Sequence, residues 1–286
     1  MNRILKIILA ILVFIAIIVG ILFYGIYISV GKVSIHYETS VSSKISADMN
    51  NVQIAFISDI NYNSFMNKER LVPMLEKLNN AHPEVVLFGG DMFDQVDLSI
   101  PDAPIQEELT SLLKSIEAPL GKFAVLGEAD MTSPEMKETV TRILKNADFE
   151  LITNSNIQLH NGTKASINLV GVDCADAGSP DIDAAFKNIS PENFTLVFTH
   201  APDIIDNFPM NGIDVVLAGH THGGQVRVPF YTLLSNKPYG EKYNFGKYNL
   251  NSTELYVSNG LGTIQVDMRL FSPPQIVIYR LIRSET

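Results

Sequence analysis

Cysteine is almost absent from this sequence of 286 residues, in which Cys174 is the only example. A single thiol excludes an intramolecular disulfide, and it excludes a zinc site built from several cysteines. Stability must therefore come from a buried core rather than from covalent links. The chain is long enough to form one.

Basic residues are also scarce, since 21 lysines and arginines stand against 31 aspartates and glutamates, for a formal net charge of −10. This balance argues against a protein that binds nucleic acid through a general basic surface, because neutralising the phosphate backbone requires clustered basic side chains. We expect no nucleic-acid partner. A small phosphate-bearing ligand held through metal ions is compatible with the charge.

Charge is missing altogether from Ile7 to Ile28. A helix of this length, at about 1.5 Å per residue, spans roughly 33 Å and can cross the hydrocarbon core of a bilayer. Arg3 and Lys6 precede the run and Tyr24 and Tyr27 lie at its far end, a pattern that predicts a cytoplasmic amino terminus.

A cleaved signal peptide is the competing interpretation of the same run. Such peptides have apolar regions of about 7 to 15 residues that end at a site of small residues, and neither feature fits well. We therefore predict that residues 1–30 form a cytoplasmic N-terminus and a single-pass anchor in the cell membrane. Residues 31–286 are then predicted to form one extracytoplasmic domain.

Beyond the apolar run, short apolar segments alternate with helical patterns. Strands are expected near residues 33–37, 52–57, 85–88, 123–126, 167–172, 196–198, 215–218, 255–257 and 275–281, and helices near 68–80, 107–116 and 134–146. This alternation predicts a mixed α/β sandwich, with a ligand site beyond the carboxyl ends of its strands.

Polar motifs follow strand after strand in this pattern. They are SDIN at 58–61, GGDMFD at 89–94, GEAD at 127–130, FTH ending at His200, and GHTHGG with His220 and His222. Each motif alone has an ordinary explanation, because aspartates after strands commonly form turns. Together, imidazole and carboxylate groups without thiolates suit two divalent ions, which can clamp a phosphoryl group and acidify a bound water.

These motifs resemble those of the calcineurin-like metallophosphoesterases, from about Gly31 to Ile282. The segments GHTHGGQVRVP, SNGLGT and RLFSPPQI are typical of a membrane-anchored bacterial branch that includes phosphodiesterases and UDP-diacylglucosamine pyrophosphohydrolases. The resemblance implies an α/β fold, a four-layer α/β/β/α sandwich after the single transmembrane helix. It also implies a two-metal site at the joined edges of its two sheets.

The resemblance also implies roles for individual residues. Asp59 and His222 would bind the first metal, Asp91 would bridge the two, and His200 and His220 would bind the second. Asn61 and Glu128 stand at the remaining ligand positions, and Asp94 would orient its neighbours by hydrogen bonds.

Three residues depart from the family pattern. Asn61 replaces a histidine ligand, Glu128 replaces an asparagine ligand, and Ala129 replaces the histidine that contacts substrate and stabilises the leaving oxygen. Asp130, which orients that histidine in the family, is then expected to lack its partner. The added carboxylate favours manganese, with iron, zinc and magnesium as alternatives.

Loss of one proton donor typically lowers a rate by about 10² to 10⁴ and leaves the metal chemistry intact. The sequence therefore predicts a slow membrane-anchored hydrolase of a phosphodiester or a pyrophosphate, on a small-molecule or lipid-linked substrate. The alternative is an inactive protein of the same fold that binds metal and phosphate. An adhesion domain without metal would leave the retained ligands unexplained.

Two further features bear on the substrate. Arg227, Lys242 and Arg269 could contact its phosphates, or each could be a solvated charge. The apolar segment Pro229–Leu234 is consistent with an ordinary buried segment, or with a lip for a lipid-linked substrate. The oligomeric state is not predicted.

Overall fold

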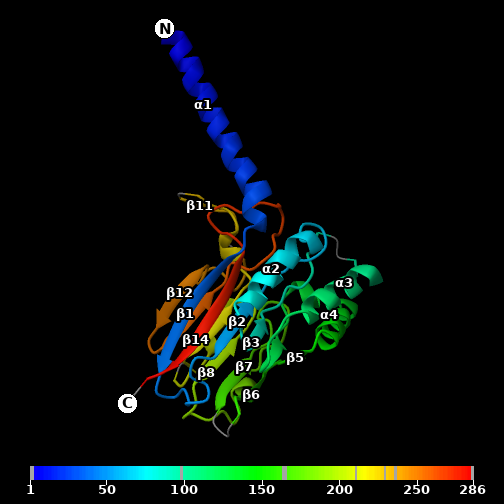
Figure 1. Cartoon of the computed structure of the whole chain (residues 1–286), viewed down its shortest axis with the longest axis vertical. Coiled ribbons are helices and arrows are strands. Elements are labelled where there is room, and N and C mark those ends of the chain that lie inside the picture. The colour runs from blue at the N-terminus through cyan, green and yellow to red at the C-terminus, as the bar shows by residue number, and fades with distance from the viewer. Residues whose placement is uncertain are drawn as a thin grey trace.

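The computed structural model describes residues 3–96, 99–162, 166–209, 211–228, 230–234 and 237–284. Its first element is α1 (Arg3–Phe23), which continues through a π-helical turn (Tyr24–Ile28) and a 3-10 turn (Ser29–Gly31). Of the described residues, only this segment forms a helix long and apolar enough to cross a membrane, a property that signal sequences share. Figure 1 shows α1 projecting away from the rest of the chain.

The remaining chain forms two six-stranded sheets and a small hairpin. The first sheet has the order β1 (Ser34–Ser42), β14 (Gln275–Arg283), β2 (Gln53–Ile57), β3 (Val85–Phe88), β4 (Gly121–Ala124), β5 (Phe149–Leu151). The second has the order β12 (Gly246–Leu250), β13 (Thr253–Val257), β9 (Val215–Ala218), β8 (Thr195–Phe198), β7 (Ser166–Gly171), β6 (Ser155–His160). The hairpin pairs β10 (Arg227–Val228) with β11 (Tyr231–Thr232).

Alternation along the strands divides the core into layers. In β2, Ile54 and Phe56 pack against the second sheet, whereas Ala55 and Ile57 face the helices, because successive side chains point to opposite faces. Helices α2 (Lys68–Asn80), α3 (Ala103–Lys114) and α4 (Pro134–Asn146) cover the outer face of the first sheet.

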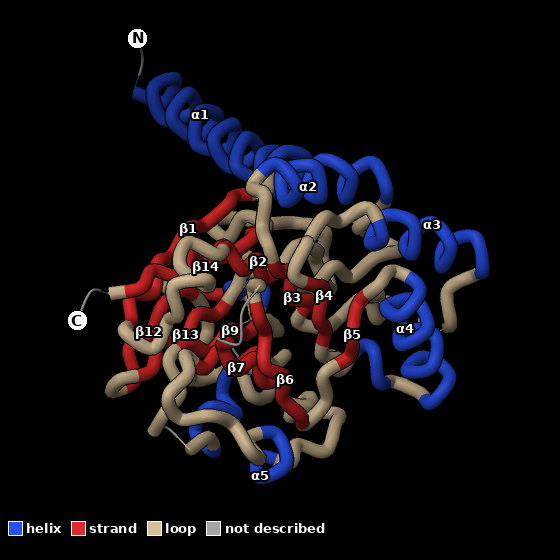
Figure 2. Tube along the Cα trace, turned by 60° about the horizontal axis from the view of Figure 1, so that its bottom comes forward, coloured by secondary structure: helices blue, strands red, loops and turns tan. Residues whose placement is uncertain are grey.

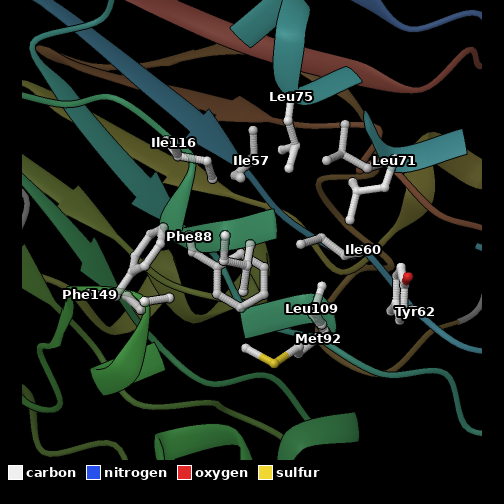
Figure 3. Packing of buried hydrophobic residues seen from close by; sticks show 14 of the residues in the cluster. Ile57, Ile60, Tyr62, Leu71, Leu75, Phe88, Met92, Leu109, Ile116 and Phe149 are labelled. Carbon is white, nitrogen blue, oxygen red and sulfur yellow. The ribbon is translucent and has the colours of Figure 1, made fainter. Parts of the chain in front are cut away.

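Figure 2 shows these helices on one side of the molecule, and Figure 3 shows the packing beneath them, where Leu71 and Leu75 of α2 approach Ile57. The outer face of the second sheet packs against α5 (Ile182–Ala185) and a 3-10 helix (Pro202–Asn207). These four layers confirm the expected α/β/β/α sandwich.

Local signals account for the helix limits. Ser133 caps α4 by accepting a hydrogen bond from the amide of Met136 at 3.1 Å, and Pro134 opens the helix as predicted. Helix α3 begins at Ala103, earlier than expected, because Pro104 lies in its first turn. Sequence periodicity missed β5, β6 and β12, which lie at sheet edges where polar residues interrupt the apolar pattern.

The order and direction of the strands place the polar motifs. Strands β2, β3 and β4 run parallel to one another, and β8 and β9 form a parallel pair in the second sheet. Parallel strands present their carboxyl ends at one edge of a sheet. The loops that carry the polar motifs therefore leave neighbouring strands in the same direction.

Candidate metal centre

The predicted ligands meet where the two sheets adjoin. One oxygen or nitrogen atom from each of Glu128, His200 and His220 lies within 4.8 Å of the others, and the same holds for Asp59, Asp91 and His200. His222 lies beside them, with Nε2 3.7 Å from Oδ1 of Asp59. The structure therefore brings six predicted side chains into one cluster, although they come from five loops.

Hydrogen bonds lock these loops together across the two sheets. The Asp59 carboxylate accepts from the backbone amide of His220 at 3.0 and 3.1 Å. In return, Nδ1 of His200 lies 2.7 Å from the carbonyl of Gly89, which follows β3 in the first sheet. Each sheet thus fixes a ligand of the other, and the cluster exists only when both sheets are packed.

Backbone carbonyls set the orientation of two histidine rings. The contact between Nδ1 of His200 and the Gly89 carbonyl assigns the ring proton to Nδ1, and the 2.7 Å contact between Nε2 of His220 and the Pro238 carbonyl assigns its proton to Nε2. The opposite nitrogens, Nε2 of His200 and Nδ1 of His220, face each other at 3.1 Å. Metal-binding histidines are held in this way, by a second partner on the ring N–H.

Two of the predicted ligands have buried polar atoms without hydrogen-bond partners. Among the described residues, Nε2 of His222 and both side-chain atoms of Asn61 lack a hydrogen bond. An unpaired buried polar group costs about 1–3 kcal/mol, so such groups are normally satisfied by protein, water or an ion. These orphaned atoms beside Asp59 fit a site that binds a metal.

The charges of the cluster lead to the same conclusion. Burial and the nearby charge of Glu128 raise the pKa of Asp91 well above its ordinary value. Burial lowers the pKa of His222 to about 3, so its imidazole is neutral at physiological pH and its lone pair is free. Lys237 pairs with Glu128, and divalent ions would supply further positive charge to the buried carboxylates of Asp59 and Asp91.

Five of the predicted ligands have a strained backbone. Asp59, Asn61, Asp91, His220 and His222 all have positive φ angles, from 47° to 71°. Such angles are uncommon for residues other than glycine, and they cost of order 1 kcal/mol or more each. The sharp turns aim these side chains back into the space between the loops.

Close packing leaves no room for a side chain at Gly127. A β-carbon placed there would lie 2.7 Å from Cε1 of His200 and still closer to the Asp91 carboxylate. Ala129, two residues after Gly127, is 3% exposed and donates its backbone N–H to Oδ1 of Asp91 at 2.9 Å. This loop therefore still supports Asp91, although Ala129 has no side-chain proton donor.

Asp130 has no histidine to orient at position 129, but its carboxylate has other partners. Its carboxylate accepts hydrogen bonds from the amides of Asp91 and Met92, both at 2.8 Å, and of Gly127 at 2.9 Å. Asp130 therefore ties the loop after β4 to the loop after β3. Backbone amides take the place of the histidine that it was expected to orient.

Asp94 lies at the margin of the cluster. Its carboxylate accepts from the amides of Ser64 at 2.5 Å and Val96 at 3.2 Å, so its hydrogen bonds shape two loops. Neither bond reaches a predicted ligand directly. It also lines a cavity of about 420 Å³ with Glu128 and Lys237.

Lys237 is a member of the site that the sequence did not reveal. Its Nζ lies 2.8 Å from Oε1 of Glu128 and 3.0 Å from the carbonyl of His220, and its side chain is 16% exposed. Burial disfavours its charge, but Glu128 outweighs burial and raises the pKa of Lys237. Lys237 and Glu128 are 109 residues apart in the sequence. The unusual carboxylate at Glu128 was the one sequence feature that could have indicated a cation beside it.

The three cations suggested for phosphate binding do not line the cavity beside Glu128. Arg227 donates to the carbonyl of Phe271 and stacks on Phe245, and Lys242 pairs with Asp206 on the surface. Arg269 is fully buried and donates to backbone carbonyls, including that of Gly262. Arg269 therefore braces the loops around His222, and in the described residues none of the three faces the cavity beside Glu128.

Comparisons with known proteins agree with this geometry. The family model described as calcineurin-like phosphoesterase matches residues 52–224. The chain is 27% identical to the uncharacterized metallophosphoesterase YkuE of Bacillus subtilis (strain 168), over 90% of this chain and 88% of the relative. It is also 27% identical to UDP-2,3-diacylglucosamine pyrophosphatase LpxG of Chlamydia trachomatis serovar D, over 82% of this chain and 85% of the relative.

A solved structure from Thermus thermophilus covers 74% of this chain and 91% of its own at 10% identity, but its TM-score of 0.45 is too low to support an inference. The family model, in contrast, spans more than half of the chain and includes the predicted metal ligands. The chain belongs to the calcineurin-like phosphoesterase family.

Proposed function

We propose that this protein is a metal-dependent phosphoesterase that slowly hydrolyses a phosphodiester or pyrophosphate bond. In this proposal α1 is a single-pass anchor within residues 1–30, and residues 31–286 form an extracytoplasmic catalytic domain. The pyrophosphatase name of the relative LpxG supports the substrate class.

The convergence of three imidazoles and three carboxylates on one space carries the proposal. Asp59, Asn61 and His222 would hold one divalent ion, and Glu128, His200 and His220 the other, with Asp91 between them. When bound, the two ions would polarise the phosphoryl oxygens and acidify a water. We expect manganese, because the donor set contains several carboxylates and no thiolate.

The residues of the cavity define what the chain itself contributes. Lys237 places an ammonium group beside the cluster, where it can balance the charge of an anionic phosphate. Ala129 cannot donate a proton, so the leaving group must depart without help from this position. A substrate with a stable leaving anion, such as the phosphate of a pyrophosphate, should therefore react faster than one that releases an alkoxide.

One observation favours the alternative of an inactive binding protein. The ammonium of Lys237 already neutralises Glu128, a predicted ligand of the second metal. Such an ion pair could stabilise the fold and compete with metal at this position. The two functions differ in turnover, not in the shape of the site.

The full chain in detergent, supplied with Mn²⁺ and bis(p-nitrophenyl) phosphate, provides the test. We expect bound manganese and slow release of p-nitrophenol, with Asp91→Ala losing both. Glu117→Ala, which removes an exposed carboxylate before β4, is the matched control and should retain both. Stoichiometric metal without hydrolysis would support the binding protein, and absence of metal from the native chain would contradict both functions.

A further inference from the structure

Exposed apolar side chains gather at the end of the domain from which α1 leaves. We call Val228, Phe230, Tyr231, Val266 and Phe271 the apolar seat. Phe230 is fully exposed, and Phe271 and Tyr231 are 68% and 57% exposed. A soluble surface rarely carries such a group of large apolar residues without a partner. Figure 1 shows β11 of this region beside the base of α1.

Backbone bonds hold the apolar seat together. The β10–β11 hairpin pairs Val228 with Tyr231, and the amide of Arg227 donates to the carbonyl of Leu270 at 2.9 Å. Phe230 lies between the two hairpin strands, and Phe271 follows Leu270. Residues from two distant segments therefore form one surface. Of the apolar segment 229–234 noted in the sequence, residue Pro229 lies outside the described residues.

The end of α1 is packed onto the same loop. The carbonyl of Gly25 accepts a hydrogen bond from the amide of Arg269 at 3.0 Å. A β-carbon at Gly25 would lie 2.8 Å from Cε of Met268, and Ser29 and Val30 are also buried. The helix is therefore joined to the domain by a packed contact, which fixes its position relative to the apolar seat.

An apolar recess of about 430 Å³ lies between α1 and this loop. It is lined by Ile17, Gly20, Ile21, Tyr24, Ser29, Leu270, Phe271 and Pro273. Ile17 is seven residues from Tyr24, or about 10 Å along a helix. If Tyr24 lies at a membrane interface, Ile17 lies in hydrocarbon, and the recess that both line must open into the same lipid.

The loop that forms one wall of the recess also reaches the catalytic cavity. Ile264 and Gln265 line the cavity that contains Glu128 and Lys237. A few residues later the chain passes through Phe271 into the recess. One short segment therefore connects the surface beside α1 with the predicted reaction site.

We propose that the apolar seat inserts into the bilayer interface, so that the catalytic cavity receives a phosphoester whose lipid tail remains in the membrane. The recess beside α1 accommodates an acyl chain of a bilayer lipid. This inference rests on the membrane anchoring in the proposed function. A bilayer lipid is the expected occupant because the recess is continuous with the apolar surface of α1.

Tryptophan fluorescence tests the insertion directly, because the chain contains no tryptophan. Phe230→Trp and Phe271→Trp each introduce a single reporter into the full-length protein, reconstituted in phosphatidylcholine vesicles with or without brominated acyl chains. Val41→Trp is the control, at an exposed position about 23 Å along β1 from Ser34. Both reporters in the apolar seat should lose most of their emission to brominated lipid, and Val41→Trp should not.

Two fluorescence results would overturn the proposal. One is emission from Phe230→Trp and Phe271→Trp that brominated lipid leaves unchanged and aqueous iodide quenches. The other is emission that neither agent quenches, which would indicate that a second copy of the chain covers the surface. Mass spectrometry of the membrane fraction shows whether the mature chain retains α1. A chain from which α1 has been cleaved would also overturn the proposal.

A paired activity measurement tests access to the cavity. The double variant Phe230→Ser/Phe271→Ser should hydrolyse soluble bis(p-nitrophenyl) phosphate as the native chain does. Its rate on phosphatidyl-p-nitrophenol in vesicles should fall about tenfold or more, because two exposed phenyl rings no longer enter lipid. Equal rates of the two proteins on both compounds would contradict the proposal. If the native chain hydrolyses neither compound, the catalytic function fails, and fluorescence still decides the insertion.

Discussion

Ala129 stands where the family resemblance implies a proton donor for the leaving group, yet its loop still supports Asp91. Its amide remains bonded to the Asp91 carboxylate, and Asp130 still ties the loop to the one after β3. The substitution therefore removes a chemical group and leaves the loop that would carry it.

Ala129→His should raise turnover of an aryl phosphodiester by about 10-fold to 10²-fold, because a positioned imidazole can protonate or contact the leaving oxygen. The gain should appear in kcat with little change in bound metal. Steady-state kinetics and metal content check this. A folded variant with the native rate would show that position 129 no longer approaches the substrate.

At the same scale, Lys237→Met should reduce kcat/KM for the diester by about 10-fold, because the variant loses a cation beside the anionic substrate. The variant should also bind inorganic phosphate more weakly. Lys242→Met is the matched control, since Lys242 is also paired with a carboxylate but lies on the surface. If Lys237→Met binds phosphate with the affinity of the native chain, the ammonium of Lys237 does not contact the substrate.

At the scale of elements, the site depends on loops held in strained turns by bonds between neighbouring strands. The Asp130 carboxylate accepts hydrogen bonds from three backbone amides in the loops after β3 and β4. Because these amides are buried, their hydrogen bonds must come from within the protein.

Asp130→Asn should therefore lower the free energy of unfolding by about 3 kcal/mol, since hydrogen bonds to a charged acceptor are each worth about 1.5–3 kcal/mol and an amide retains only part of them. Urea unfolding measures this loss. Asp181→Asn, which changes the cap of α5, serves as the comparison and should cost much less. Equal losses in the two variants would refute a special role for Asp130.

At the scale of the whole molecule, the predicted metal site joins the loops of the two sheets, since Asp59 follows a strand of the first sheet and accepts from the amide of His220, which follows a strand of the second. Binding to the native state alone should stabilise the protein by mass action, by about 2.7 kcal/mol at a Mn²⁺ concentration of 100 times Kd. For a chain of this size that corresponds to a rise in Tm of roughly 4–5 °C.

Calorimetry with Mn²⁺ and with a chelator measures this rise. The Asp91→Ala variant should show no dependence on Mn²⁺. An equal rise in that variant would place the stabilising ion outside the cluster.

The sequence by itself determined the alternation of strands and helices, the apolar helix and the strand ends that carry Asp59, Asp91 and His220. These features depend on short-range patterns, because apolar spacing, caps and polar turns are encoded by neighbouring residues. Only the tertiary structure decided the partners of Asp130, the ion pair between Lys237 and Glu128, and the positions of Arg227 and Arg269 away from the cavity. Those contacts join segments far apart in the chain, and their geometry exists only after the two sheets have packed together.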